Sequence, residues 1–213
     1  MRKVNLLIKR FVDILGSFIG IIILSPLFIL VAICIKVTSE GPVFFKQKRL
    51  GKDGKVFDII KFRTMIVNAE KIGDGLTVKS EDDPRITKVG KLLRKTSLDE
   101  LPQLINVLKG DMSLVGPRPP ATYFPYDGYE NYPEWAKRRF DMRPGMTGLA
   151  QITVRNSVVW DKRIVIDNIY IDEFNILLDT KILLLTVARI IKPQNIYYST
   201  PVAREVKAKD LNI

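Results

Sequence analysis

The pattern of hydrophobic and polar positions is dominated by one apolar stretch near the N-terminus, from Phe11 to Ile35. It is interrupted by Asp13 near its start and by Ser25-Pro26 in its middle. A straight helix of this length would extend about 37 Å, enough to cross a hydrocarbon core of about 30 Å. Pro26 opposes a straight helix because it removes a backbone donor and clashes with the preceding turn. A break there leaves halves of about 22 Å and about 15 Å, and neither crosses the core alone.

Basic residues flank this stretch on both sides, and cationic flanks favour the cytoplasmic side of a membrane. The sequence therefore predicts a re-entrant membrane hairpin over residues 1–37, with a helix, a break at Ser25 and Pro26, and a second helix. The Ser25 hydroxyl would help to satisfy the backbone groups freed at the break. The alternative is a kinked helix that spans the bilayer. The flanking residues are Arg2, Lys3, Lys9 and Arg10 before the stretch and Lys36, Lys46, Lys48 and Arg49 after it.

Shorter elements follow the membrane stretch. Two strand-like segments, 43–45 and 56–60, surround the turn signal Lys52-Asp53-Gly54-Lys55 and predict a β-hairpin. Residues 72–84 are polar and contain two glycines, which predicts a mobile loop. Helical patterns come next, at 86–95 and 101–108.

The last apolar segment covers 176–192 and is short for a membrane span. It fits the core of the domain and the membrane interface equally well. The charged residues beyond it predict a loose tail over 196–213. The chain is therefore expected to have three parts, the hairpin, a domain over 38–195 and the tail.

Composition narrows the class of protein. With 46% hydrophobic and 27% charged residues, the chain is neither disordered nor a polytopic transporter. The formal charge of +11 favours polyanionic partners, namely nucleic acid, anionic lipid head groups or phosphorylated small molecules. The sequence has no histidine, which excludes Ser-His and Cys-His nucleophile pairs and zinc sites with histidine ligands. Acid–base or covalent chemistry must then use carboxylates, lysine, tyrosine or a metal ion.

Two adjacent carboxylates, Asp99 and Glu100, lie at a predicted helix start. Ser97 and Glu100 match a capping box, which is the commoner reason for such residues. Pro102 favours a helix that begins at Asp99 instead, because proline is tolerated in a first turn. The Asp99 carboxylate would then lie at the positive end of the helix and stay ionised. An ionised carboxylate suits a nucleophile or a magnesium ligand.

Two arginines occur in rigid turns rich in glycine and proline. Arg118 follows Gly116-Pro117, and Arg143 precedes Pro144-Gly145. Each could offer a preorganised guanidinium to a phosphate, although each alone is more often a surface turn. Neither a phosphate-binding loop nor a dinucleotide-binding glycine signature is present, so nucleotide binding of the kinase or dehydrogenase kind is not expected.

Taken together, these motifs resemble the small phosphoglycosyl transferases of bacteria, which initiate glycan assembly on a lipid carrier. The resemblance extends from about Lys9 to about Ile190. It is carried by several ordered motifs rather than by one. They are Ser25-Pro26, Lys61-Phe62-Arg63-Thr64-Met65, Asp83-Pro84-Arg85, Thr96-Ser97-Leu98-Asp99-Glu100-Leu101-Pro102-Gln103, Gly110-Asp111-Met112-Ser113, Gly116-Pro117-Arg118-Pro119 and Arg143-Pro144-Gly145-Met146-Thr147-Gly148-Leu149-Ala150-Gln151.

The resemblance implies a helix-rich α+β fold, in which a re-entrant helix-break-helix packs on a small cytoplasmic α/β catalytic domain with interfacial amphipathic helices. The enzyme would be monotopic in the bacterial inner membrane, with its active site on the cytoplasmic face. Asp99 would attack the β-phosphate of a UDP-sugar and release UMP, and polyprenyl phosphate would accept the sugar phosphate. Glu100 would assist by proton transfer and by organising the site, and Mg²⁺ would bind at Asp99.

Further residues take roles from the same resemblance. Arg94, Arg118, Arg143 and Arg155 would hold phosphates, Lys61 and Arg63 would also bind substrate, and Asp167 would lie in the site. One departure affects the loop near Arg155. Where relatives often have Val-Asn-Gly-Arg-Asn, this chain has Ile152-Thr153-Val154-Arg155-Asn156, so the contribution of this loop to sugar choice stays open.

Three questions stay open at the level of sequence. A membrane-tethered basic adaptor that binds nucleic acid or anionic lipid without catalysis is the rival hypothesis. The basic residues are spread across rigid turns, so nucleic acid is not expected as a partner. The sugar is also open, with the short chain favouring an N-acetylhexosamine or diamino sugar over a hexose. The sequence does not decide whether the protein forms a homodimer.

Overall fold

The computed structural model describes residues 2–72, 82–154 and 158–191. It is rich in helices and contains two small sheets, so the α+β class is confirmed. The predicted loop 72–84 and tail 196–213 lie mostly or wholly outside the described residues. In chain order the elements are α1 (Arg2–Thr38), β1 (Phe44–Leu50), η1 (Lys52–Gly54), β2 (Val56–Phe62), η2 (Ala69–Lys71), α2 (Lys88–Thr96), η3 (Leu98–Glu100), α3 (Gln103–Lys109), β3 (Ser113–Val115), α4 (Glu134–Lys137), η4 (Arg138–Phe140), β4 (Gly145–Thr147), α5 (Leu149–Thr153), α6 (Trp160–Glu173) and α7 (Ile176–Ile191).

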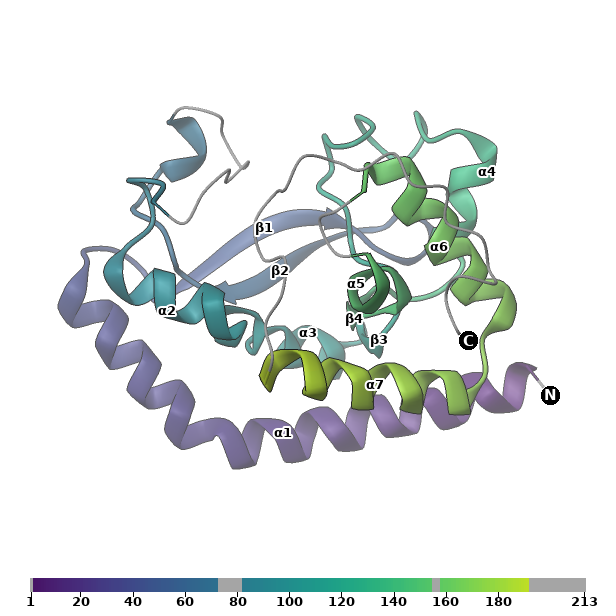
Figure 1. Cartoon of the computed structure of the whole chain (residues 1–213), viewed down its shortest axis with the longest axis horizontal. Coiled ribbons are helices and arrows are strands. Elements are labelled where there is room, and N and C mark those ends of the chain that lie inside the picture. The colour runs from purple at the N-terminus through teal and green to yellow at the C-terminus, as the bar shows by residue number, and fades with distance from the viewer. Residues whose placement is uncertain (1, 73–81, 155–157, 192–213) are drawn as a thin grey trace.

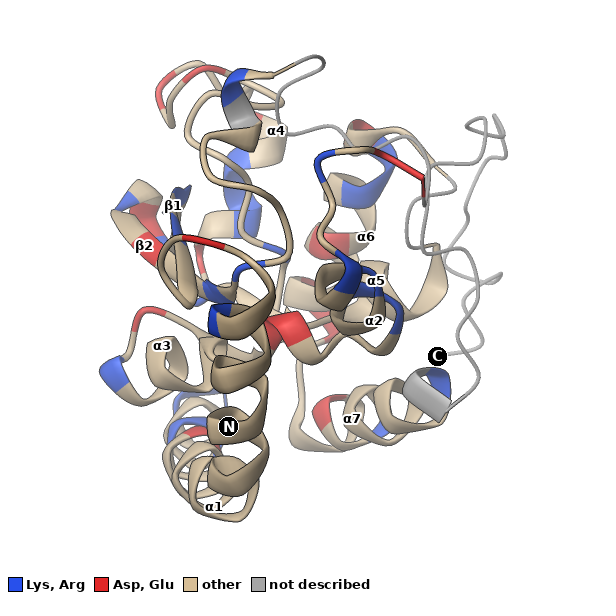
Figure 2. Ribbon diagram, turned by 90° about the vertical axis from the view of Figure 1, so that its left-hand side faces the viewer, with Lys and Arg blue, Asp and Glu red and all other residues tan. Residues whose placement is uncertain are grey.

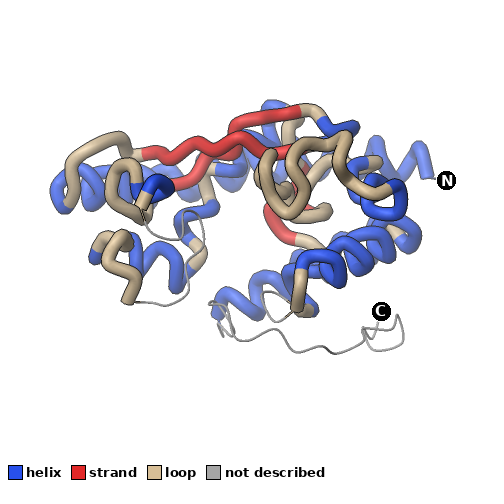
Figure 3. Tube along the Cα trace, turned by 90° about the horizontal axis from the view of Figure 1, so that it is seen from above, coloured by secondary structure: helices blue, strands red, loops and turns tan. Residues whose placement is uncertain are grey.

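The first sheet is the predicted hairpin. β1 and β2 are antiparallel, and their register runs from Phe44 opposite Phe62 to Leu50 opposite Val56. The strands are longer than the sequence pattern indicated, and they lie side by side in Figure 3. The turn between them uses left-handed backbone at Asp53, with φ of 55°, and at Gly54, with φ of 72°.

The second sheet is smaller and joins two distant motifs. β3 and β4 are parallel, with Ser113 opposite Gly145 and Val115 opposite Thr147. Behind this pair, α5, α6 and α7 enclose the largest hydrophobic cluster of the described residues. Val115, Leu149, Ile166, Tyr170 and Ile182 are among its members, all at most 3% exposed. The core therefore lies next to the strands that carry the glycine- and proline-rich motifs.

The apolar N-terminal stretch forms one helix, α1, with Pro26 inside it. The structure has one continuous helix in place of the two that were expected, and α1 is visibly bent part-way along its length (Figure 1). Proline at position 26 cannot donate to the Ile22 carbonyl one turn earlier. The Ser25 hydroxyl donates to that carbonyl instead, at 2.8 Å. This bond satisfies the acceptor that proline leaves free and lets the helix continue.

The first half of α1 turns polar side chains towards the protein and apolar ones away from it, whereas Val31 and Ile35 are buried in its second half. Lys9, Asp13 and Ser17 are buried against the body, at successive intervals of four residues. The outward positions include Leu7 and Ile23, with 72% and 69% of their surface exposed. Only 11% of the most apolar part of α1 is buried. A core helix of a soluble protein would bury these side chains, so the arrangement supports membrane association.

For residues 176–192 the sequence left open whether they belong to the core or to the membrane interface. The helix α7 has both a core face and an exposed apolar face. Ile182 is fully buried, whereas Leu177 and Leu184 are 82% and 68% exposed. α1 and α7 lie along the same side of the molecule (Figure 1), and both are mainly uncharged along their length (Figure 2).

Candidate active site

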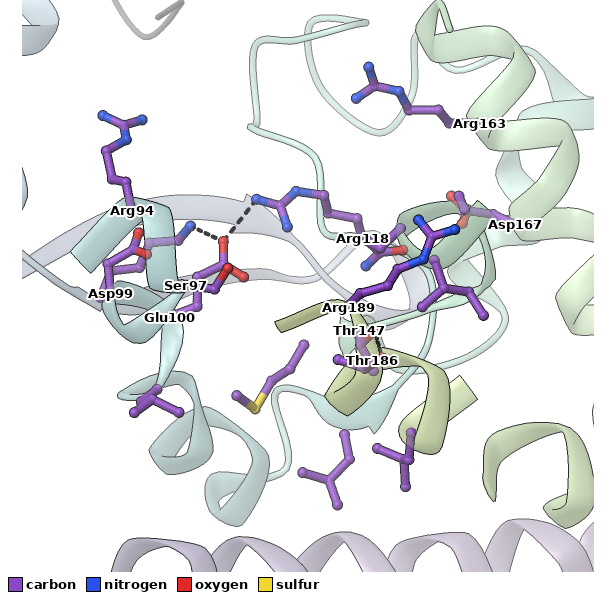
Figure 4. Close-up of a pocket in the computed structure, with 18 of the residues that line it drawn as sticks. Arg94, Ser97, Asp99, Glu100, Arg118, Thr147, Arg163, Asp167, Thr186 and Arg189 are labelled. Carbon is purple, nitrogen blue, oxygen red and sulfur yellow. Dashed lines mark hydrogen bonds and ion pairs between the residues drawn. The ribbon is translucent and has the colours of Figure 1, made fainter. Parts of the chain in front are cut away.

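A cavity of about 440 Å³ separates two groups of elements. We call the side chains from β2, the end of α2, η3 and the loop after β3 the first wall, and those from the start of α5, from α6 and from α7 the second wall. In Figure 4 the first wall lies on the left and centre and the second on the right. The first wall consists of Lys61, Arg94, Ser97, Asp99, Glu100 and Arg118, and the polar residues of the second wall are Gln151, Trp160, Arg163, Asp167, Thr186 and Arg189.

The two adjacent carboxylates lie on a short 3-10 turn between two helices. Ser97 ends α2 in a left-handed conformation with φ of 57°, and α3 begins only at Gln103. The prediction of a helix start at Asp99 is therefore wrong, because Pro102 precedes the helix. Ser97 makes no capping bond through its side chain, so the capping-box hypothesis is wrong as well. Both carboxylates are left for other contacts.

Glu100 is held by two cations of the first wall. Lys61 Nζ donates to Glu100 Oε1 at 2.6 Å, and Arg118 Nη2 donates to the same oxygen at 3.0 Å (Figure 4). Burial alone would raise the pKa of Glu100, but Arg118 and Lys61 hold that pKa well below its usual range. Glu100 is thus a fixed negative charge that orients two phosphate-binding candidates.

Asp99 has a different environment from its neighbour. Among the residues that the structure describes, its carboxylate has no hydrogen bond and no ion pair within 4 Å. Burial raises the pKa of Asp99 to about 6, with Lys61 opposing the shift and the charge of Glu100 adding to it. At neutral pH the group is therefore largely ionised, and its oxygen lone pairs are not engaged. This is the condition that a carboxylate nucleophile or a metal ligand requires.

The position of Arg118 follows from the pairing of β3 with β4. Gly116 N donates to Thr147 O at 2.8 Å, and Gly145 N donates to Pro117 O at 2.9 Å. A Cβ atom added to Gly145 would lie 2.0 Å from Gly116 N, so this close approach requires glycine. The two motifs that looked like separate arginine turns in the sequence therefore form one unit, and this unit directs Arg118 towards Glu100.

Asp167 is the predicted residue of the second wall. It lies on α6, is 2% exposed, and pairs with Arg139 at 2.8 Å. Burial raises the pKa of Asp167 to about 6, although Arg139 and Arg163 lower it. Asp167 lines the cavity, as expected, but its charge is already paired with Arg139, which does not line the cavity.

Two other predicted residues, Arg143 and Arg63, do not line the cavity. Arg143 is exposed, and its Nε donates to Gly110 O at 2.8 Å. Arg63 is buried and donates to the carbonyls of Ser39 and Glu40, just after α1. Arg155 lies outside the described residues. Their roles in substrate binding stay predictions.

Several cavity residues were missed by sequence reasoning. On α6, Trp160 and Arg163 precede Asp167 at helical spacings of seven and four, and on α7 Thr186 and Arg189 are one turn apart. The spacing to Asp167 was a usable signal for Trp160 and Arg163. No comparable signal marked Thr186, whose hydroxyl lies 2.7 Å from that of Thr147 on β4.

Comparison with known proteins adds to this geometry. The family model described as bacterial sugar transferase matches residues 4–193, nearly the whole chain. The chain belongs to the bacterial sugar transferase family. Membership favours an enzyme over the non-catalytic adaptor considered from the sequence.

Individual members of the sugar transferase family show how the lengths compare. The galactosyl transferase CpsE of Streptococcus agalactiae is 48% identical over 86% of this chain, which spans only 42% of CpsE. The uncharacterized sugar transferase EpsL of Bacillus subtilis is 40% identical, and the match covers 94% of this chain and 95% of EpsL. The UDP-glucose:undecaprenyl-phosphate glucose-1-phosphate transferase of Escherichia coli is 42% identical over 86% of this chain and 40% of its own length.

Proposed function

We propose that this protein transfers a sugar 1-phosphate from a UDP-sugar to a polyprenyl phosphate such as undecaprenyl phosphate. The reaction would be the first membrane step in the assembly of a glycan. The observation that carries the proposal is the contrast between the two carboxylates, because Glu100 is bound by Lys61 and Arg118 while Asp99 has no such partner among the described residues. The family match and the names of relatives support the same reaction class.

Asp99 is the nucleophile of the proposed mechanism. A carboxylate oxygen attacks the β-phosphorus of the UDP-sugar, which forms an acyl phosphate bond and breaks the bond from that phosphorus to the bridging oxygen. UMP leaves with the electron pair of the broken bond. An oxygen of polyprenyl phosphate then attacks the same phosphorus, forms a diphosphate linkage and releases the Asp99 carboxylate.

The cations of the first wall balance the phosphate charge in this scheme. Arg118 and Lys61, both oriented by Glu100, offer preorganised donors to the β-phosphate, and Arg94 lines the same part of the cavity. The low pKa of Glu100 makes it a poor proton acceptor, so its position supports a role in organising the site rather than in proton transfer.

The carboxylate of Asp99 and the phosphates of the UDP-sugar are ligands that suit magnesium. Mg²⁺ is usually held by one or two carboxylates together with substrate phosphates, and no group of three or more Asp, Glu or Cys side chains suited to a metal occurs in the described part of the chain. Asp99 and the donor phosphates would hold the ion. Its contribution would be to offset phosphate charge and polarise the phosphoryl oxygens.

The contacts of α1 support a re-entrant, monotopic arrangement. Lys9 near its start bonds to Val115 O at 2.8 Å, and Ile35 near its end packs in the cluster of Phe62 and Leu93. Since both ends of the bent helix contact the same globular body, both ends belong on one side of the bilayer. The basic flanks favour the cytoplasm as that side. A lipid acceptor could then reach Asp99 without leaving the membrane.

The donor sugar is proposed to be a hexose. CpsE carries galactosyl transferase in its name, and the Escherichia coli relative is named for glucose 1-phosphate. These names do not favour the N-acetylhexosamine or diamino sugar that the short chain suggested. UDP-galactose and UDP-glucose are therefore the first donors to test.

The covalent intermediate provides the decisive experiment. The protein in detergent is mixed with UDP-galactose or UDP-glucose and Mg²⁺ without acceptor, and its intact mass is measured. We expect a mass increase of one sugar phosphate, located on Asp99 by peptide mapping and removed by adding undecaprenyl phosphate. Asp99→Asn is expected to show no adduct and no UMP release, whereas the exposed Asp172→Asn should behave like wild type. Product formation by Asp99→Asn, or formation without any adduct in the wild type, would refute the mechanism.

Topology is tested separately in cells. Cys34 is the only cysteine of the sequence, so a Cys34→Ser background allows single cysteines to be placed by Lys3→Cys and by Lys46→Cys. Both are expected to resist a membrane-impermeant thiol reagent until the inner membrane is opened. Labelling of the Lys3→Cys protein in intact spheroplasts would instead show that α1 spans the membrane.

A further inference from the structure

Behind the second wall lies an arginine that the proposed chemistry does not use. Arg139, on η4, is 2% exposed and does not line the cavity. Its guanidinium lies over the rings of Trp160 and Phe140, at 5.3 Å and 5.7 Å from their centroids. A buried guanidinium is costly unless its charge and donors are matched, so its contacts indicate what it does.

Arg139 contacts both walls through one nitrogen. Its Nη2 lies 2.8 Å from Asp167 Oδ2 on α6 and donates to the main-chain carbonyl of Arg118 at 2.7 Å. Nε and Nη1 have no hydrogen-bond partner among the described residues. The polar contacts that hold this buried cation are therefore the two that join the Arg118 loop to the second wall.

The main chain of the loop around Arg118 is fixed by a series of hydrogen bonds, and the bond from Arg139 is one of them. Four successive carbonyls, those of residues 117–120, each accept a hydrogen bond from a different donor. They pair in order with Gly145 N at 2.9 Å, Arg139 Nη2 at 2.7 Å, Arg49 Nη1 at 3.1 Å and Leu50 N at 3.1 Å. Arg118 lies between two prolines, which restrict the backbone further. The Arg139 bond is the one at the residue whose side chain meets Glu100.

The geometry points to Arg139 as a positioning residue that fixes Arg118 against Glu100 and sets the separation of the two walls. It also matches the charge of Asp167, which would otherwise face an anionic donor across the cavity. The inference rests on the proposed function, because the group to be positioned is the phosphate of a nucleotide sugar. Arg139 touches neither substrate nor reacting atoms.

The first test compares Arg139→Met with Arg138→Met. Arg138 is the adjacent residue, is half exposed and pairs with Asp172 at the surface. Arg138→Met therefore removes the same charge but leaves the contacts of Arg139 with Asp167 and the Arg118 carbonyl in place. We expect Arg139→Met to lower kcat/KM for UMP release about 10- to 100-fold, the size expected when a catalytic group is misplaced by about 1 Å. Arg138→Met should stay within twofold of wild type, and Arg139→Lys, which keeps a charge and one donor, should fall between them. Equal rates for the two methionine variants would overturn the inference.

A second variant separates positioning from simple loss of stability. Arg139→Met leaves Asp167 buried without its cation, which can lower the melting temperature by itself. In Arg139→Met/Asp167→Asn the unpaired charge is gone, so the melting temperature should return towards that of Asp167→Asn. The inference expects kcat/KM of the double variant to stay at least tenfold below that of Asp167→Asn. If the two have the same kcat/KM, Arg139 only neutralises Asp167 and the inference is wrong.

UDP binding, measured by calorimetry, keeps this inference distinct from the proposed reaction. We expect UDP to bind Arg139→Met about tenfold more weakly than wild type or Arg138→Met. If wild type binds UDP but releases no UMP from any UDP-sugar, the proposed function fails. The ratio of the UDP dissociation constants of Arg139→Met and wild type still tests the role of Arg139. If UDP does not bind wild type, or binds all three proteins equally, the inference itself is overturned.

Discussion

The carboxylates on the two walls of the cavity differ in whether they have a cationic partner. On the first wall, Glu100 is bound by Lys61 and Arg118, and the adjacent Asp99 has no hydrogen bond or ion pair among the described residues. On the second wall, Asp167 is matched by the buried Arg139. Asp99 is therefore the carboxylate of these three that is left for chemistry. In the proposed mechanism, the reactive carboxylate is the one that has no partner of its own.

The largest effect expected from this comparison, after loss of Asp99 itself, is that of Glu100→Gln. The neutral amide would no longer hold Lys61 and Arg118 with a charge, and removal of one preorganised electrostatic group typically costs about 10²- to 10³-fold in rate. Glu134→Gln is the matched control, since Glu134 pairs with Lys137 at the surface. The measurement is the initial rate of UMP release. A rate within threefold of wild type would remove Glu100 from the mechanism.

The next prediction concerns pH and uses the raised pKa of Asp99, about 6. Protonation would remove the proposed nucleophile, so kcat/KM should fall as the pH drops through about 6. Lys61 lowers the pKa of Asp99, so Lys61→Met should move the inflection to higher pH. Asp167 has a similar pKa, so the profile is also recorded for Asp167→Asn. If that variant loses the acid limb, the limb belongs to the second wall.

A smaller effect is expected on the second wall at Arg189. This arginine lines the cavity from α7, away from Asp99 and Glu100 (Figure 4). If it contributes uniform binding to the donor, Arg189→Met should raise KM about 3- to 10-fold with kcat nearly unchanged. Lys181→Met, on the same helix but outside the cavity lining, is the control. A fall in kcat with unchanged KM would mean that the second wall acts in the transition state too.

The smallest effect on catalysis is expected at the exposed face of α7. Leu184 is 68% exposed, so Leu184→Gln should change the free energy of unfolding in detergent by less than about 0.5 kcal/mol. The same substitution should lower retention in sedimented membranes if this face contacts lipid. Ile182→Ala is the contrasting variant, because Ile182 is fully buried and its loss should cost about 2–5 kcal/mol. Unchanged membrane retention of Leu184→Gln would place that face in water.

Local elements could be predicted well where the pattern itself limits the backbone. The hairpin, the helices near 86–95 and 101–108 and the last helix all occur, with ends shifted by a few residues. The exception was the region around Asp99, where an expected helix start is a 3-10 turn. Ser97 there serves as the end of α2, and a capping pattern in one sequence does not distinguish the end of one helix from the start of the next.

The sequence by itself determined the apolar stretch of α1, the absence of histidine chemistry, the ordered motifs and the identity of the carboxylate pair, because these depend on residue type and spacing alone. The tertiary structure decided which carboxylate is engaged, which arginines face the cavity and which face of α1 is buried. Arg118 reaches Glu100 because β3 pairs with β4. Arg163 and Arg189 line the cavity because of how α6 and α7 pack. Hydrophobic periodicity specifies a face of an element, but the partner of that face is set by contacts between residues far apart in the chain.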